Sequence, residues 1–95
     1  MFVRVVRFTD VDSERVSALL NRIEGSGGPP PGVNATGIQM LFDEDQRTAL
    51  VSQQFATRED MEEGAKVFAA MDPSETPGTR ASVDHCELKL ERSMS

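Results

Sequence analysis

Tryptophan and tyrosine are absent from this chain of 95 residues, and cysteine and histidine occur once each. A single cysteine, Cys86, excludes an internal disulfide and is typical of a reducing compartment, although a disulfide between two chains stays open. No apolar run approaches the roughly 20 residues of a membrane helix, and Arg4 and Arg7 interrupt the opening MFVRVVRFTD, which is too short for a signal peptide. We therefore expect a cytoplasmic protein that does not insert into membranes.

Basic side chains are also few. The sequence has ten lysines and arginines and sixteen aspartates and glutamates, which gives a net charge of -6. Such a chain repels phosphate backbones, so nucleic acid is not an expected partner. The length predicts one domain, residues 1–95, and a chain of this size gains stability from any apolar surface buried through association.

Apolar periodicity predicts six elements separated by turn residues. The predicted strands are Phe2–Phe8, Thr36–Phe42, Thr48–Phe55 and Ala81–Glu91, and the predicted helices begin after the caps Asp12 and Thr57 and end near Glu24 and Asp72. The glycine- and proline-rich segment Gly25–Asn34 lacks a GK[ST] ending, so we interpret it as a connecting loop. The acidic turn Asp43–Arg47 lacks calcium-loop spacing and is interpreted as a solvated hairpin turn.

The order β, α, β, β, α, β predicts an α+β domain of the ferredoxin-like type. Its two helices cover one face of a four-stranded antiparallel sheet. Both faces of the first strand carry apolar residues, with Val3 and Val5 on one face and Val6 and Phe8 on the other. In the second strand, Leu41 lies on the face opposite to the other apolar residues. We therefore expect the uncovered face to be buried against the sheet of a second copy.

Five stretches resemble a known family: FVRVVRF, the LL-x-x-I of the first predicted helix, GIQMLFDED followed by TALVSQQF, and TREDMEEGAKVFAAM. They are similar to the dimeric α+β barrel proteins, specifically the antibiotic-biosynthesis-monooxygenase-like group. The resemblance covers almost the whole chain and implies a homodimer with a ligand pocket between each sheet and its helices. Oxygenases of this group use Asn, Trp and Tyr, whereas this chain has no Trp or Tyr. Haem-degrading relatives carry a histidine on the second helix, whereas His85 lies in the predicted last strand.

Potential metal ligands gather only in the last predicted strand, at Asp84, His85, Cys86 and Glu87. Alternation places His85 and Glu87 on one face and Asp84 and Cys86 on the other, which leaves two ligands per face where zinc takes three or four. We expect no metal site and no cofactor. His85 oriented by Glu87 is the candidate general base, and the alternative is a solvated histidine at a sheet edge. Cys86 alternates with Leu88 and Leu90, which predicts a small buried apolar residue.

Polar residues inside the predicted strands give the candidate ligand site. Arg4 lies in the first strand, and Ser52, Gln53 and Gln54 lie in the third, which this fold places beside the first. Buried polar groups need partners, so these residues either bond to one another or line a cavity. The site hypothesis takes Arg4, Ser52 and Gln54 as sharing one face, with further lining residues Phe68 and Met71.

Two functions remain open from the sequence. The first is a homodimeric domain that binds a small organic molecule between sheet and helices without assigned chemistry. The second is a cofactor-independent monooxygenase or related isomerase acting on an aromatic or polyketide-like substrate.

Overall fold

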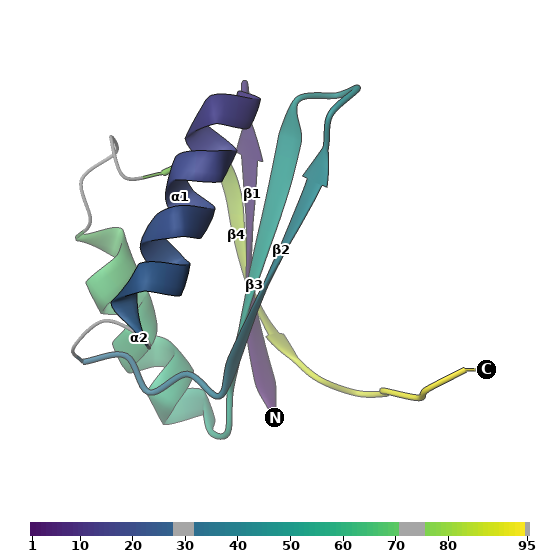
Figure 1. Ribbon diagram of the computed structural model, residues 1–95. Helices are drawn as coiled ribbons and strands as arrows, with labels where there is room; N and C mark the ends of the chain where they lie inside the picture. The colour runs from purple at the N-terminus through teal and green to yellow at the C-terminus, as the bar shows by residue number, and fades with distance from the viewer. Residues whose placement is uncertain (28–31, 71–75, 95) are drawn as a thin grey trace.

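The computed structural model describes residues 1–27, 32–70 and 76–94, and it has the predicted element order. The strands are β1 (Phe2–Thr9), β2 (Gly37–Asp43), β3 (Thr48–Phe55) and β4 (Thr79–Glu87), and the helices are α1 (Ser13–Ser26) and α2 (Arg58–Ala69). Both helices lie on one side of the sheet (Figure 1). The ferredoxin-like α+β prediction is therefore confirmed. No helix in these ranges is long and apolar enough to cross a membrane.

The sheet is antiparallel, with the strand order β2-β3-β1-β4. β1 and β3 are therefore the central strands, and β2 and β4 are the edges. Directly opposed residues of antiparallel strands share a face, so the register assigns every strand side chain to one side of the sheet. The register shifts between Arg7 and Phe8 opposite β4, which marks a bulge there.

The helix side of the sheet carries most of the core. Val6 and Phe8 of β1 and Ala49 and Val51 of β3 are buried there, together with Val11. A second cluster joins α2 to the sheet through buried Phe55, Met61 and Val33. This alternation of buried and exposed residues is what two central strands covered on one side require.

The helices begin where the sequence predicts. The side chain of Asp12 accepts hydrogen bonds from the backbone N–H groups of Glu14 at 2.7 Å and Arg15 at 3.2 Å. Thr57 accepts one from Asp60 N at 3.1 Å, which is half of the predicted capping box. α1 ends at Ser26 and α2 at Ala69, and the predicted stop at Asp72 lies outside the described residues.

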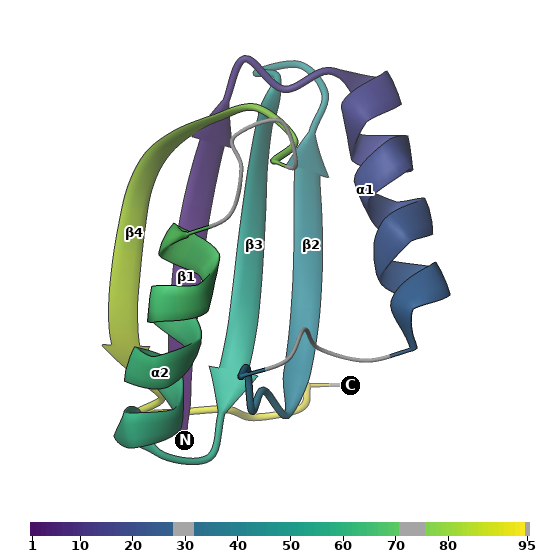
Figure 2. The same cartoon turned by 90° about the vertical axis from the view of Figure 1, so that its left-hand side faces the viewer.

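The two helices cover the sheet unequally. α2 lies in front of β1 and β4, whereas α1 stands toward the β2 edge (Figure 2). On the helix side of β2, Ile38 is 47 % exposed and Phe42 37 % exposed. Every residue of β4 is exposed, so α2 leaves the helix side of this edge strand uncovered.

The open face, which the helices do not cover, is less apolar than predicted. It carries Val3, Val5 and Leu50, all half-buried, and Leu41, which is 57 % exposed. Polar residues are interspersed with them: Arg7, Gln39, Ser52, Gln54, Ser82 and Asp84. The sequence of β1 alone overestimated how apolar the open face is, because the residues that pair with Val3 and Val5 on β3 and β4 are mostly polar.

Two predictions for the last strand are wrong. β4 ends at Glu87 instead of Glu91, because beyond Leu88, whose N–H bonds to Met1 O at 2.9 Å, the chain leaves the sheet on its open-face side (Figure 1). Cys86 is exposed instead of buried, because no layer formed by the described residues covers its side of the edge strand.

Candidate functional site

A polar row crosses the helix side of the sheet at one level. Gln53 of β3, Arg4 of β1 and His85 of β4 are successive partners in the register. Arg4 is 3 % exposed and Gln53 is 5 % exposed, and Arg4 Nη1 donates a hydrogen bond of 3.0 Å to Gln53 Oε1. This pair is the polar interior of an otherwise apolar layer. A buried guanidinium is a costly feature for so small a domain.

Phe68 of α2 closes the helix side of this row. The guanidinium carbon of Arg4 lies 5.1 Å from the centroid of the Phe68 ring, within the range of a cation–π contact. The backbone oxygen of the same residue accepts a 3.3 Å hydrogen bond from Arg80 Nη2. Two guanidinium groups therefore contact one residue of α2, one through the ring and one through the carbonyl group.

The electrostatics of Arg4 are unfavourable in the isolated chain. Burial, and secondarily the positive charge of Arg80, lower the pKa of Arg4 from its ordinary value to about 10. Within the described ranges no carboxylate lies at ion-pair distance from its guanidinium, and its buried Nε atom has no hydrogen-bond partner. Buried charges are ordinarily paired, so this environment is one that an added anion would relieve.

The structure brings together only part of the predicted ligand site. Arg4 and Phe68 are in contact, as predicted. The prediction that Arg4 shares its face with Ser52 and Gln54 is wrong, because the register pairs Arg4 with Gln53 and so turns both neighbours of Gln53 to the open face. Met71 lies outside the described residues.

The acidic, histidine and cysteine residues of β4 are distributed as predicted. His85 and Glu87 lie on the helix side, opposite Arg4 and Phe2, whereas Asp84 and Cys86 lie on the open face. Glu87 pairs with Lys89, at 3.3 Å between Oε2 and Nζ. Among residues 1–27, 32–70 and 76–94, no three His, Cys, Asp or Glu side chains gather into a metal-binding group. A catalytic role of His85 stays a prediction.

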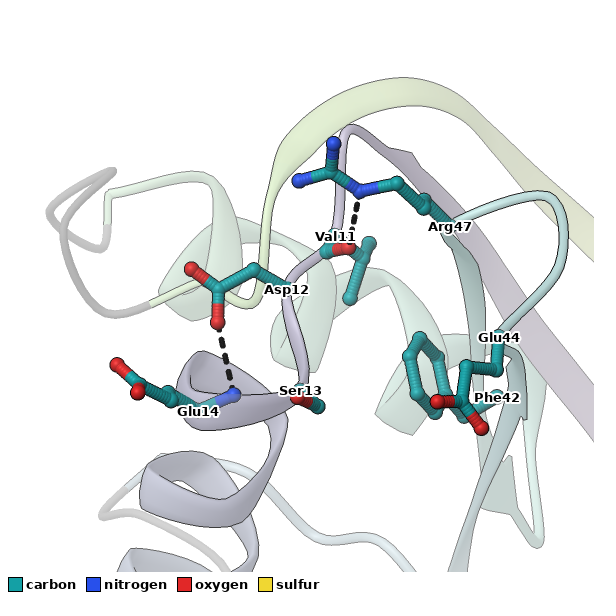
Figure 3. Close-up of a pocket in the computed structure, with 7 residues that line it drawn as sticks. All are labelled: Val11, Asp12, Ser13, Glu14, Phe42, Glu44 and Arg47. Atoms are coloured by element: carbon teal, nitrogen blue, oxygen red, sulfur yellow. Dashed lines mark hydrogen bonds between the residues drawn. The ribbon is translucent and has the colours of Figure 1, made fainter.

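A pocket of about 510 Å³ opens elsewhere, where the N-terminus of α1 meets the β2–β3 hairpin (Figure 3). Its lining comprises Val11, Asp12, Ser13, Glu14, Phe42, Glu44 and Arg47. The Asp12 carboxylate caps α1, and Arg47 Nε donates to Val11 O at 3.3 Å. No predicted site residue lines this pocket, and two of its polar groups already stabilise the fold.

Two residues of the observed site were absent from the predicted one. Gln53 was recognised as a polar strand residue, but choosing it over its neighbours required the pairing register. Arg80 precedes the predicted last strand, and only the extension of β4 back to Thr79 brings it opposite Phe8 on the helix side.

Comparisons of the chain with models of protein families, with curated proteins and with solved structures give no match.

Proposed function

We propose that this protein binds a small organic molecule between its sheet and its helices, at the site formed by Arg4, Gln53 and Phe68. The supporting observation is the buried Arg4, which has an unpartnered donor atom and no acidic partner in the described ranges. Such a group is stabilised when a ligand supplies the missing acceptor. The helix side of β4 is exposed beside this site, which gives a small molecule a direction of approach.

We further propose that the chain forms a homodimer through the open face, as a member of the antibiotic-biosynthesis-monooxygenase-like group of dimeric α+β barrel proteins. Leu41 on the open face and Leu90 and Met94 in the segment after β4 are exposed apolar side chains. That segment extends on the open-face side of the sheet (Figure 1). Pairing two open faces would remove these side chains from water.

The binding proposal is tested with adjacent residues on opposite faces. Gln53→Ala and Gln54→Ala are compared with the natural chain in a thermal-shift screen against small aromatic molecules, because Gln53 contacts Arg4 whereas Gln54 faces the open side. We expect stabilisation by a bound molecule to be lost in Gln53→Ala and kept in Gln54→Ala. The reverse pattern would place binding on the open face and contradict the proposed site.

The dimer proposal is tested by sedimentation velocity at micromolar concentration. We expect a dimer for the natural chain and a monomer for Leu50→Asp, which puts a charge beside Leu41 on the open face. Leu20→Asp on α1 is the control for an added charge, since Leu20 is exposed on the helix side, and this variant should stay dimeric. A natural chain that sediments only as a monomer would contradict the proposal.

A cofactor-independent monooxygenase or related isomerase is the second candidate function. The observation that favours it is the position of His85, a possible general base, beside Arg4 in the β1–β4 register. Oxygen consumption with aromatic and polyketide-like substrates distinguishes this enzyme from a binding protein. We expect any such activity to be lost in His85→Ala, and the absence of uptake across the panel would favour binding alone.

A further inference from the structure

The unpartnered donors of Arg4 lie on one edge of its guanidinium. A guanidinium carries five N–H donors in a planar arrangement, and Nη1, on the Cδ side, is the group that bonds to Gln53. The opposite edge presents Nε and Nη2 side by side. Nε is buried without an acceptor, and among the described residues no acceptor is seen for Nη2 either. This pair of parallel donors is the geometry that a carboxylate accepts with both oxygens.

The charged group that acts on this edge is positive. Arg80 of β4 is the charged neighbour that disfavours the cation of Arg4, and it is held nearby by its bond to Phe68 O on α2. The other groups at this level are the amide of Gln53 on β3 and the imidazole of His85 on β4. Two arginines therefore lie close together although the net charge of the chain is -6, and no carboxylate of the described residues forms an ion pair with Arg4.

We infer that the small molecule is an organic carboxylate whose two oxygens accept hydrogen bonds from Nε and Nη2 of Arg4. This inference rests on the proposed function and adds the charge and the binding mode of the ligand. Arg80 supplies a second positive charge, and Phe68 and Val83 offer apolar surface on the same side of the sheet. Val83 is 38 % exposed and pairs with Val6, one level along the strands from Arg4. The molecule therefore combines an anionic group with a small apolar body.

Benzoate and benzamide are the probes, because they share size and ring and differ in charge. Binding is measured by titration in ¹H–¹⁵N NMR spectra that record the Nε–Hε group of Arg4. We expect benzoate to shift this signal and benzamide to leave it unmoved. The signal is observed in the natural chain, so the readout does not depend on how any variant folds.

Variants then separate charge from geometry. Arg4→Lys keeps the charge but removes the planar pair of donors, so we expect at least a tenfold loss of benzoate affinity, the lower end expected for charge-assisted hydrogen bonds. Arg80→Gln removes a neighbouring charge, together with the bond to Phe68 O, and should weaken benzoate binding severalfold. Arg92→Gln, a change of the same kind in the exposed segment after β4, should leave the affinity unchanged.

The outcomes are distinguishable from failure of the proposed function. Benzamide binding as tightly as benzoate, or unchanged benzoate affinity in Arg4→Lys, would overturn the carboxylate inference while the small-molecule site itself stands. If neither these probes nor any aromatic molecule of the thermal-shift screen binds, both proposals fall. A benzoate affinity lowered equally by Arg92→Gln and Arg80→Gln would show unspecific attraction to positive charge and would also overturn it.

Discussion

Replacing the buried polar pair by apolar residues should stabilise the ligand-free protein. In the folded chain the pKa of Arg4 falls from its ordinary value to about 10. One pKa unit corresponds to about 1.4 kcal/mol, so holding this guanidinium charged inside the fold costs about 3 kcal/mol. Arg4→Met alone removes this cost but leaves Gln53 Oε1, which accepts from Arg4, buried without a donor. That loss costs about 1–3 kcal/mol, so the single substitution should change stability little.

The double variant Arg4→Met, Gln53→Leu removes both polar groups together. We expect its free energy of unfolding at pH 7 to exceed that of the natural chain by about 1–3 kcal/mol, as is found when buried ionic groups are replaced by apolar residues of similar volume. Urea denaturation of the natural chain, both single variants and the double variant, at one protein concentration, measures this difference and the coupling between the two sites.

The pH dependence of the stability difference between the two chains tests whether the charge of Arg4 is its cause. Because the pKa of Arg4 is lower in the folded state, the cost is fully present at every pH below about 10. Above about pH 10 the unfolded chain holds the Arg4 proton more tightly than the folded chain does, so the natural chain gains stability with rising pH relative to the double variant. The difference between them should therefore narrow above pH 10. A double variant less stable than the natural chain at pH 7 would refute the reasoning.

Two smaller predictions concern the helices. Asp12→Ala should lower the free energy of unfolding by about 1 kcal/mol in urea denaturation, because the carboxylate caps α1 through two backbone N–H groups. Gly64→Ala should lower the thermal midpoint even though alanine is the better helix former, because its Cβ would lie 2.9 Å from Cε1 of the fully buried Phe55 ring.

Each of these has a matched control. Asp12→Asn preserves a side-chain acceptor and should stay within a few tenths of a kcal/mol of the natural chain, so a loss equal to that of Asp12→Ala would contradict the cap. Gly25→Ala in α1 meets no atom within 4 Å and should raise stability by about 0.5–1 kcal/mol. Equal effects at Gly25 and Gly64 would show that the Phe55 contact is not limiting.

Local patterns predicted most of the fold. The bounds of β3 and the caps Asp12 and Thr57 depend on neighbours within a few residues, so sequence alone located them. The end of β4 was less predictable: Leu88 and Leu90 continue the alternation of a strand, but no partner strand continues beside them.

The candidate site depended on contacts that sequence does not contain. Phe68 lies near Arg4, as predicted, but the hydrogen-bond partner of Arg4 was predicted wrongly, since shifting a strand pair by one residue exchanges Gln53 for Ser52 or Gln54. The exposure of Cys86 was missed for a related reason. Its alternation with leucines indicates burial only where a second layer exists, and in the part of the chain that the structure describes no such layer covers that side of β4.

The strand order β2-β3-β1-β4 also has a consequence for how the chain folds. β1 is synthesised before the other three strands of this sheet, yet it lies in the middle of the sheet. Phe2 can therefore pair with Phe55 on one side and with Glu87 on the other only after those residues have been made. Contacts of such long sequence separation slow folding, because the intervening chain must be ordered first. During synthesis the apolar first strand therefore has two unpaired edges, and the β2–β3 hairpin is the earliest part of the sheet that can form from local contacts alone.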